Sequence, residues 1–302
     1  MRLRTIRYTG AMDRDARTAG ILFVVATPIG NPEDLSPRAL RILAEADRIA
    51  CEDTRRAGLM LAAHAIRRPM ISYFEHNEER RTPEIVARLA AGEKIALITD
   101  AGTPAISDPG YRLVRAALEA GIPVRAVPGP SAVVAALSVA GIATNRFAFE
   151  GFLPQRDAAR HRHLESLARE PRTLVFYEAG RRLGATLAAM AAALGAAREA
   201  AIVREITKTY EETIRAPLGD LARRFAATAA LGEITIVVAG AREVSPADDS
   251  VVESPVTVEM LIAAGLSLAQ ASGIIARLTG RRRREIYQQA IKSRAAAEKS
   301  GE

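Results

Sequence analysis

The sequence predicts an α/β protein made of two consecutive α/β domains followed by a small, helical and basic C-terminal domain. Short apolar runs rich in Val and Ile alternate with helical patterns as far as residue 240. Beyond the polar stretch 241–254 the helical patterns continue, but no strand-like run follows. The chain has 302 residues and is 49% hydrophobic, which is enough apolar material for more than one core.

The first half has the alternation that is typical of an open parallel sheet. The pattern predicts strands at 21–26, 48–52, 94–99 and 122–128. Between them, Ser36 followed by Pro37 marks the start of one helix, as an N-cap followed by a proline in the first turn. The segment from Thr82 to Gly92 carries the same start signals and a closing glycine, so we expect a second helix there.

The second half repeats this alternation and predicts a second α/β unit. Its expected strands are 147–153, 172–178, 200–205 and 233–240, with a polar helix and an alanine-rich helix between them. The resulting division is a disordered basic N-terminal extension (1–20), a first α/β domain (21–133), a second α/β domain (134–242), a linker (243–254) and a helical basic domain (255–302).

Composition and charge narrow the classes of protein. A single cysteine, Cys51, excludes a disulfide framework and favours a reducing, cytoplasmic setting, and the apolar runs are too short to span a membrane. The net charge of +7 comes from the two ends of the chain: residues 277–299 hold eight Lys or Arg against two Glu. Such a segment favours a nucleic-acid partner slightly over a merely solvated basic surface, because phosphate contacts release counterions.

Several common chemistries have no motif in the chain. It has neither the lysine-containing phosphate loop nor the G-x-G-x-x-G dinucleotide fingerprint nor a G-x-S-x-G elbow, and its four histidines include no i,i+4 pair, so no metal is expected. Four small-residue loops follow predicted strands instead, at 27–35, 100–110, 128–132 and 176–182. They hold few cations, so they favour a neutral adenosine carrying a cationic sulfonium over a polyphosphate.

Eight segments, in order along residues 21–240, resemble the motifs of bacterial small-subunit (16S) ribosomal RNA cytidine 2′-O-methyltransferases. These enzymes belong to the tetrapyrrole-methylase, or class III methyltransferase, superfamily. The segments are "FVVATPIGNPEDLSPRAL", "CEDTRRAGLML", "EHNEERR", "ITDAGTPAISDPGYRLV", "VPGPSAVVAALSVAG", "FEGFLP", "VFYEAGRRL" and "REITKTYEE". One departure is "FYEAGRR", where relatives usually have Ser-Pro-His after the Glu, so a substrate contact could differ there.

The resemblance implies two tetrapyrrole-methylase-type α/β domains with S-adenosylmethionine in the cleft between them, and a homodimer. It also implies an acceptor ribose in the decoding region of small-subunit ribosomal RNA, presented as RNA or as the 30S subunit. The residues that match the family's donor-binding motifs are Thr27, Pro28, Gly30, Asp100, Gly102, Thr103, Ser131, Ala132, Tyr177 and Thr235. For Thr235 a second interpretation is a strand residue that faces a neighbouring strand.

Methyl transfer from a sulfonium requires alignment of three atoms, and a ribose hydroxyl is a weak nucleophile that a nearby base would assist. The candidate groups are Glu52 and Asp53, Glu75 beside His76, and Lys208 near Glu205, although positioning alone could suffice. The cations expected to contact RNA phosphates are Arg55, Arg56, Arg281, Arg282, Arg283 and Arg284.

Two other classes share part of this pattern. A methylase acting on a small tetrapyrrole would have the same loops but would not need the basic tail. A non-catalytic RNA-binding protein would need the tail but not four strand-end loops.

Overall fold

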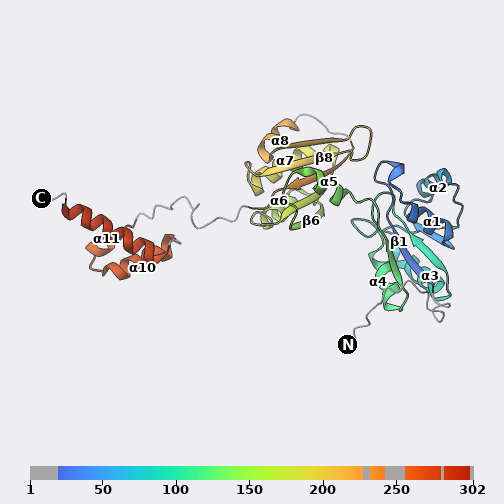
Figure 1. Ribbon diagram of the computed structural model, residues 1–302, viewed down its shortest axis with the longest axis horizontal. Coiled ribbons are helices and arrows are strands. Elements are labelled where there is room, and N and C mark those ends of the chain that lie inside the picture. The colour runs from blue at the N-terminus through green and yellow to red at the C-terminus, as the bar shows by residue number, and fades with distance from the viewer. Residues whose placement is uncertain (1–19, 227–231, 242–255, 280–281, 300–302) are drawn as a thin grey trace. The chain divides into compact units, whose positions relative to one another are not determined.

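The computed structural model describes residues 20–226, 232–241, 256–279 and 282–299 (Figure 1). The chain divides into one compact unit, Met1–Ala241, and a second unit, Arg242–Glu302. The predicted N-terminal extension, apart from Gly20, and the predicted linker lie outside the described residues.

The first sheet is fully parallel and has the strand order β3-β2-β4-β1-β5. Its strands are β1 (Ile21–Val25), β2 (Arg48–Cys51), β3 (Met70–Ser72), β4 (Lys94–Leu97) and β5 (Val124–Val127). Because β1 lies between β4 and β5 and is covered on both faces, all five of its side chains are apolar, as "ILFVV" shows.

Helices cover both faces of this sheet (Figure 1). The helices of one face, α1 (Pro37–Glu45) and α2 (Thr54–Ala63), pack on Phe23 and Val25, and those of the other, α3 (Glu78–Ala90) and α4 (Tyr111–Glu119), pack on Leu22. The predicted N-cap of α1 is confirmed, because the Ser36 hydroxyl accepts a hydrogen bond from the Ala39 amide at 3.1 Å. A short 3₁₀ turn, Pro32–Asp34, precedes α1.

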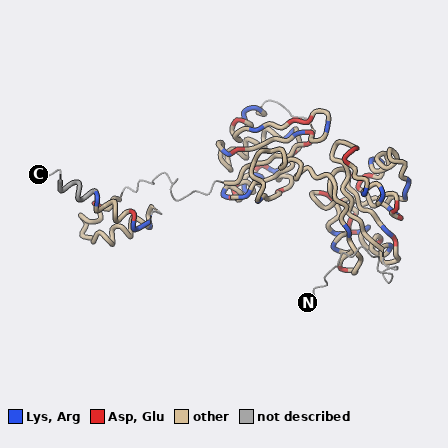
Figure 2. Tube along the Cα trace, in the orientation of Figure 1, with Lys and Arg blue, Asp and Glu red and all other residues tan. Residues whose placement is uncertain are grey.

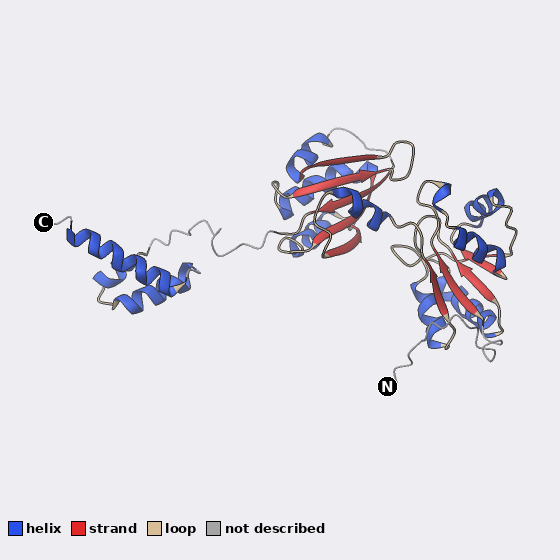
Figure 3. Cartoon of the chain, viewed as in Figure 1, coloured by secondary structure: helices blue, strands red, loops and turns tan. Residues whose placement is uncertain are grey.

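The second sheet is mixed, with the order β6-β7-β10-β8-β9. Only its β6–β7 pair is parallel. The strands are β6 (Phe147–Phe152), β7 (Thr173–Ala179), β8 (Glu199–Arg204), β9 (Glu212–Pro217) and β10 (Glu233–Val238). Three helices, α6 (Asp157–Ser166), α7 (Leu183–Leu194) and α8 (Leu218–Arg224), cover one face, and α5 (Ala132–Ala140) packs on the other. Figure 3 shows the strands of both sheets together with their helices.

The described residues of the C-terminal unit form helices and their connections, with no strand among them. It contains α9 (Val258–Ala263), α10 (Leu268–Thr279) and α11 (Arg283–Lys299), which share a small core around Ala271, Ile275 and Ile286. A break separates α9 from α10 at 265–267, where Gly265 has φ +90° and the Ser267 hydroxyl accepts from the Gln270 amide as the cap of α10. In the described part of the chain, no helix combines the length and the apolar character that a membrane span needs.

Three elements differ from the sequence-based expectation. Helix α3 begins at Glu78, one turn before the predicted start at Thr82, and Pro83 lies inside it. Thr82 therefore does not cap the helix. Its hydroxyl lies 3.0 Å from the buried Tyr73 hydroxyl instead. Strands β3 and β9 were not predicted, because β3 has three residues and β9 reads as a polar segment.

Cys51 at the end of β2 is buried, and burial raises the pKa of its thiol to about 12, with the charges of Asp100 and Asp53 adding to the rise. A neutral thiol is a poor nucleophile. We therefore expect iodoacetamide at pH 8 to leave the folded protein unmodified and to alkylate the chain once it is unfolded in guanidinium chloride, as measured by mass spectrometry. Stoichiometric labelling of the folded protein would contradict this environment.

Candidate active site

The loops that follow β1 and β4 are fastened to each other at the carboxyl end of the first sheet. Thr27 and Gly102 exchange backbone hydrogen bonds of 2.9 and 3.1 Å, and the Thr27 hydroxyl donates to the Thr99 carbonyl oxygen at 3.0 Å. Thr27 is only 1% exposed. Its side chain therefore fixes the geometry of the two loops and is shielded from solvent, and its predicted contact with the donor stays a prediction.

A cavity of about 300 Å³, here called the donor cavity, is lined by residues of both sheets. It brings together six of the ten residues that the resemblance predicts for donor binding. These six are Gly102, Thr103, Ser131, Ala132, Tyr177 and Thr235. Loops that follow parallel strands meet at one edge of a sheet, which explains how distant parts of the sequence reach one cavity.

Two residues of the 100–110 loop shape the wall on the side of the first sheet. Gly102 has φ +85°, a backbone conformation that residues with a side chain rarely adopt. The Thr103 hydroxyl donates to the Pro130 carbonyl oxygen at 3.1 Å, which ties this loop to the turn before α5. The wall is therefore largely backbone, held in one conformation.

The opposite wall is aromatic. Tyr177 and Thr235 are partners across the antiparallel β7–β10 pair, so both face the same side of the second sheet. The Tyr177 ring lies 4.8 Å from the Phe149 ring and 5.5 Å from the Phe152 ring, measured between centroids. Phe152 lines the cavity as well. This wall offers flat apolar surface to a ligand.

The described lining of the donor cavity includes three carboxylates, Asp108, Glu178 and Glu233, and neither Lys nor Arg. Glu178 is 2% exposed, accepts a hydrogen bond from the Thr186 hydroxyl at 2.6 Å and pairs with Arg182 at 3.4 Å. Such a lining suits a cation or a neutral group and disfavours a polyphosphate.

A second cavity, of about 490 Å³, adjoins the first through the shared lining residues Ile29, Ala101 and Glu233. It holds three of the other predicted donor-binding residues, Pro28, Gly30 and Asp100, together with the cations Arg56 and Lys208. The predicted donor residues are thus divided between two neighbouring cavities, and we call this second one the basic cavity.

A contact between the two sheets borders the basic cavity. The Asn31 amide, after β1, donates to the Thr207 hydroxyl, after β8, at 3.1 Å. A Cβ atom at Gly30 would lie 2.8 Å from that hydroxyl oxygen and 2.5 Å from Lys208 Cγ. Glycine at position 30 therefore permits the close approach of these loops.

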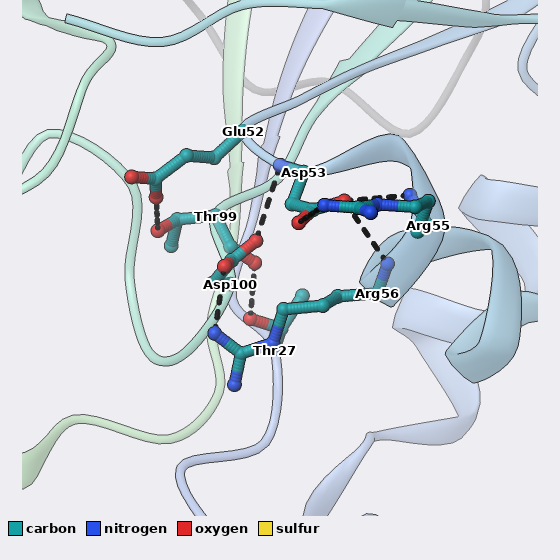
Figure 4. A network of polar contacts seen from close by, with 7 residues as sticks. All are labelled: Thr27, Glu52, Asp53, Arg55, Arg56, Thr99 and Asp100. Carbon is teal, nitrogen blue, oxygen red and sulfur yellow. Dashed lines mark hydrogen bonds and ion pairs between the residues drawn. The ribbon is translucent and has the colours of Figure 1, made fainter.

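Asp100 is engaged by protein groups (Figure 4). One of its carboxylate oxygens accepts from the Asp53 amide at 3.2 Å, and the other accepts from the Arg56 guanidinium at 2.8 Å. The Asp53 carboxylate in turn accepts from the Arg55 and Arg56 amides as the N-cap of α2. Asp100 therefore positions the start of α2, and its predicted contact with the donor stays a prediction.

The four predicted catalytic residues have different environments. The hydrogen bond from the Arg55 backbone amide lowers the pKa of Asp53. Burial raises the pKa of Glu52, whose carboxylate accepts a hydrogen bond from the Thr99 hydroxyl at 3.4 Å. Lys208 pairs with Glu205 at 2.9 Å and Glu233 at 3.2 Å. Burial opposes its charge, but these bonds raise the pKa of Lys208 above its ordinary value.

Glu75 lies apart from these groups. It is exposed in the turn between β3 and α3 and lines neither cavity. The structure therefore brings Lys208 to the basic cavity and Glu52 and Asp53 to the neighbouring strand end, but it leaves Glu75 outside.

The predicted RNA-binding arginines lie in both units (Figure 2). The Arg55 side chain is 92% exposed, whereas Arg56 is held by Asp100. In the C-terminal unit Arg282, Arg283 and Arg284 are exposed, at the start of α11. Arg281 lies outside the described residues.

Sequence reasoning missed Asp108, which lines the donor cavity. Burial raises the pKa of its carboxyl to about 6, and the charges of Glu52 and Asp100 add to the rise. The signal was present as the "SDPG" that ends the 100–110 loop, but Asp-Pro-Gly is also ordinary turn chemistry before a helix. The apolar lining residues Ile29, Ile106 and Ile206 carried no chemical signal.

Residues 22–222, which include most of both sheets and the residues of the donor cavity up to Val203 and Ile206, match the family described as Tetrapyrrole (Corrin/Porphyrin) Methylases. The fold and the site are therefore those of a methyltransferase. The chain belongs to the tetrapyrrole methylase family. It is 45% identical over 276 residues to the Ribosomal RNA small subunit methyltransferase I of Pseudomonas aeruginosa, covering 91% of this chain and 98% of that protein. It is also 45% identical over 279 residues to the protein of the same name from Synechocystis, covering 91% and 99%.

Solved structures show the same fold. Uroporphyrin III C-methyltransferase from Thermus thermophilus matches in its native form with a TM-score of 0.53 and 21% identity, over 72% of this chain and 97% of that one. The same enzyme complexed with S-adenosylhomocysteine matches with a TM-score of 0.50 and 22% identity, over the same shares. The predicted family, α/β fold class and enzyme class are confirmed.

Proposed function

We propose that this methyltransferase transfers a methyl group from S-adenosylmethionine to the 2′-hydroxyl of a cytidine ribose in the decoding region of small-subunit ribosomal RNA. The proposal draws on relatives at 45% identity that are named Ribosomal RNA small subunit methyltransferase I. The observation that carries it is the donor cavity, whose lining combines six predicted residues from both sheets with carboxylates and no lining cation in the described chain.

The residues of the donor cavity fit S-adenosylmethionine, which supplies an electrophilic methyl group on a sulfonium. The backbone at Gly102 and Thr103 can approach the ligand closely, because Gly102 has no side chain. Its φ of +85° is a conformation that favours glycine at this position. Tyr177 and Phe152 offer the adenine ring a flat apolar surface. The carboxylates favour the positive charge.

The chain contributes alignment and exclusion of water. The loops after β1 and β4 are fastened to each other at Thr27 and Gly102, and the Thr103 bond to Pro130 ties the same wall to the turn before α5. A rigid wall of this kind keeps an acceptor oxygen in line with the transferred group, which is the main requirement of a direct displacement.

The RNA lies against the basic cavity in this proposal. That cavity adjoins the donor cavity and is lined by Arg56 and Lys208, each of which also pairs with a carboxylate of the lining. The exposed Arg55 lies at the same helix start as Arg56. Phosphate contacts by such cations position a strand without reading its sequence. Arg282, Arg283 and Arg284 add contacts from the C-terminal unit, and Arg281 is proposed with them.

The protein acts as a homodimer in the cytoplasm in this proposal. Support for the dimer comes from exposed apolar side chains, Val134 on α5 at 61% and Phe147 at the start of β6 at 42%. A single cysteine agrees with a reducing compartment. Light scattering coupled to size-exclusion chromatography measures the number of subunits, and a monomer at micromolar concentration would contradict the dimer.

Mass spectrometry of ribosomal RNA nucleosides from cells with and without the gene tests the function. We expect one 2′-O-methylcytidine to disappear and to return when the purified protein is added with S-adenosylmethionine to RNA or to 30S subunits. Unchanged ribosomal RNA, together with methylation of uroporphyrinogen by the purified protein, would favour the small-molecule alternative instead. Calorimetry that detects no binding of the donor would favour a non-catalytic RNA-binding protein.

Deleting residues 250–302 is expected to weaken RNA binding and to leave donor binding unchanged, because the donor cavity lies wholly in the first unit. Fluorescence anisotropy with an RNA hairpin at several salt concentrations measures both the affinity and its salt slope. Each phosphate contact that is lost lowers the slope by about 1. A truncated protein with the affinity and salt slope of the whole chain would place the RNA site in the first unit alone.

A matched pair of variants separates specific contacts from net charge. Replacing Arg282, Arg283 and Arg284 by alanine should reproduce most of the loss. Replacing the exposed Arg41, Arg67 and Arg80 of the first unit removes the same charge and should cost less affinity.

A further inference from the structure

Among the three carboxylates of the donor cavity, Asp108 is the one whose charge the protein leaves uncompensated. Glu178 pairs with Arg182, and Glu233 pairs with Lys208. No ion pair of Asp108 occurs among the described residues, although Asp108 is partly buried. Burying a carboxylate without a cation costs stability, so its persistence at a cavity wall points to a role there.

The groups that face Asp108 come from three strands. Glu52 follows β2, Asp100 follows β4, and the Tyr177 hydroxyl projects from β7, and all three interact electrostatically with it. Burial raises the pKa of Asp108 to about 6, the two acidic neighbours add to the rise, and the Thr99 hydroxyl opposes it through a hydrogen bond. The Arg56 guanidinium, which also interacts with Glu52, is engaged by Asp100.

The other candidate bases are less suited to accept a proton from a ribose hydroxyl. The pKa of Asp53 is lowered by the Arg55 amide, so its carboxylate is a weaker base, and it is occupied as the helix cap. Lys208 is protonated because its bonds to two glutamates raise its pKa. Glu52 and Glu75 line neither cavity.

We propose that the Asp108 carboxylate is the general base that accepts the proton of the acceptor hydroxyl during methyl transfer. The proposal rests on the function proposed above. The acceptor oxygen forms its bond to the methyl carbon, and the carbon–sulfur bond breaks with its electron pair left on sulfur. The hydroxyl proton passes to Asp108 and from there to water. The products are the methyl ether and the neutral sulfide, so atoms and charge balance.

This role has a defined pH dependence. The carboxylate is the active form, so the rate of methyl transfer should rise with pH and level off above the pKa of Asp108. The rising limb should therefore lie near pH 6, the pKa of the Asp108 carboxyl. In the free protein the titration of Asp108 itself should centre near 6.

The test uses the full-length protein and the variants Asp108→Asn, Asp108→Glu and Asp220→Asn. Asp220 lies on α8 with half of its side chain exposed and serves as the matched control. Three quantities are measured. The first two are the single-turnover rate on ribosomal RNA from pH 5 to 8 and the affinities for S-adenosylmethionine and S-adenosylhomocysteine. The third is the pH titration of the Asp108 carboxyl ¹³C signal in the free protein, which is identified by its absence from the spectrum of Asp108→Asn. Thermal melting confirms that each variant is folded.

We expect Asp108→Asn to lower the single-turnover rate at pH 7.5 by about 10²- to 10⁴-fold, with both affinities within about threefold of wild type. Asp108→Glu should restore part of the rate, and Asp220→Asn should behave as wild type. A variant rate within threefold of wild type would overturn the proposal. So would a loss of affinity confined to S-adenosylmethionine, because it would make Asp108 a charge partner of the sulfonium.

The carboxyl titration does not depend on enzymatic activity. The only variant that it requires is Asp108→Asn, which identifies the NMR signal of the Asp108 carboxyl. A midpoint above that of an exposed aspartate supports the partly buried, unpaired environment from which the proposal is argued, and a midpoint at or below it overturns the proposal. If Asp108→Asn does not fold, Asp108→Ser replaces it in the same measurements. A wild-type protein that binds the donor but methylates no ribosomal RNA would contradict the proposed function, and the titration would still report on Asp108.

Discussion

Replacing Gly102 by valine is expected to weaken binding of S-adenosylmethionine by about 10- to 100-fold, which corresponds to about 1.4 to 2.8 kcal/mol. Gly102 has φ +85°, a conformation that costs a residue with a side chain about 1–2 kcal/mol and costs a β-branched one more. Relief of that strain would move the loop that forms the cavity wall. Isothermal titration calorimetry with the purified variant measures the loss.

Gly121 supplies a control for the effect of backbone strain at a position that lines neither cavity. It has φ +72° after α4, and a Cβ atom there would meet nothing within 4 Å. The Gly121→Val variant should lose about 1–2 kcal/mol of stability and keep the wild-type affinity for the donor. Equal affinities of the Gly102 variant and the wild type would show that this loop does not contact the donor.

Replacing Glu178 by alanine is expected to lower the free energy of unfolding by about 3 kcal/mol. Glu178 is 2% exposed, its carboxylate accepts hydrogen bonds from the Thr186 hydroxyl and the Ala179 amide, and it pairs with Arg182. Its removal leaves the guanidinium of Arg182, 22% exposed, without its ionic partner. Guanidinium chloride unfolding followed by circular dichroism measures the change.

Two variants calibrate this loss. Thr186→Val removes one hydrogen bond and should cost about 1 kcal/mol. Glu119→Ala breaks the exposed pair with Arg115 and should change stability by about 0.5 kcal/mol or less. A Glu178 variant as stable as the Glu119 variant would mean that the buried network contributes little to the stability of the second sheet.

Much of the fold was predictable from short-range signals. The strands of the first sheet except β3 read as apolar runs, and Ser36 with Pro37 located the start of α1, because capping chemistry and burial act within a few residues. The motif resemblance also found the residues that line the donor cavity from both sheets, such as Gly102 and Tyr177.

The misses have a physical cause in contacts that each element makes outside its own residues. Helix α3 starts before Pro83 because the turn after β3 sets its beginning, with the Asn77 side chain bonded to the Ser72 carbonyl oxygen and the Phe74 amide. Strand β9 forms because β8 provides its partner, although its own residues are polar. Asp108 became recognisable only when the chain brought Glu52 and Asp100 close to it.

The position of β1 in the first sheet has a consequence for synthesis of the chain. Ile21 pairs with Lys94 on one side and Leu22 pairs with Val124 on the other, so the first strand to leave the ribosome cannot complete its pairing until β5 has emerged. Until then its apolar run has no sheet to join, and unpaired strands of this kind are prone to aggregation. The nascent chain should therefore depend on chaperone protection until about residue 127 has been exposed, and the antiparallel β8–β9 pair, which is local in sequence, should form soon after its own residues appear.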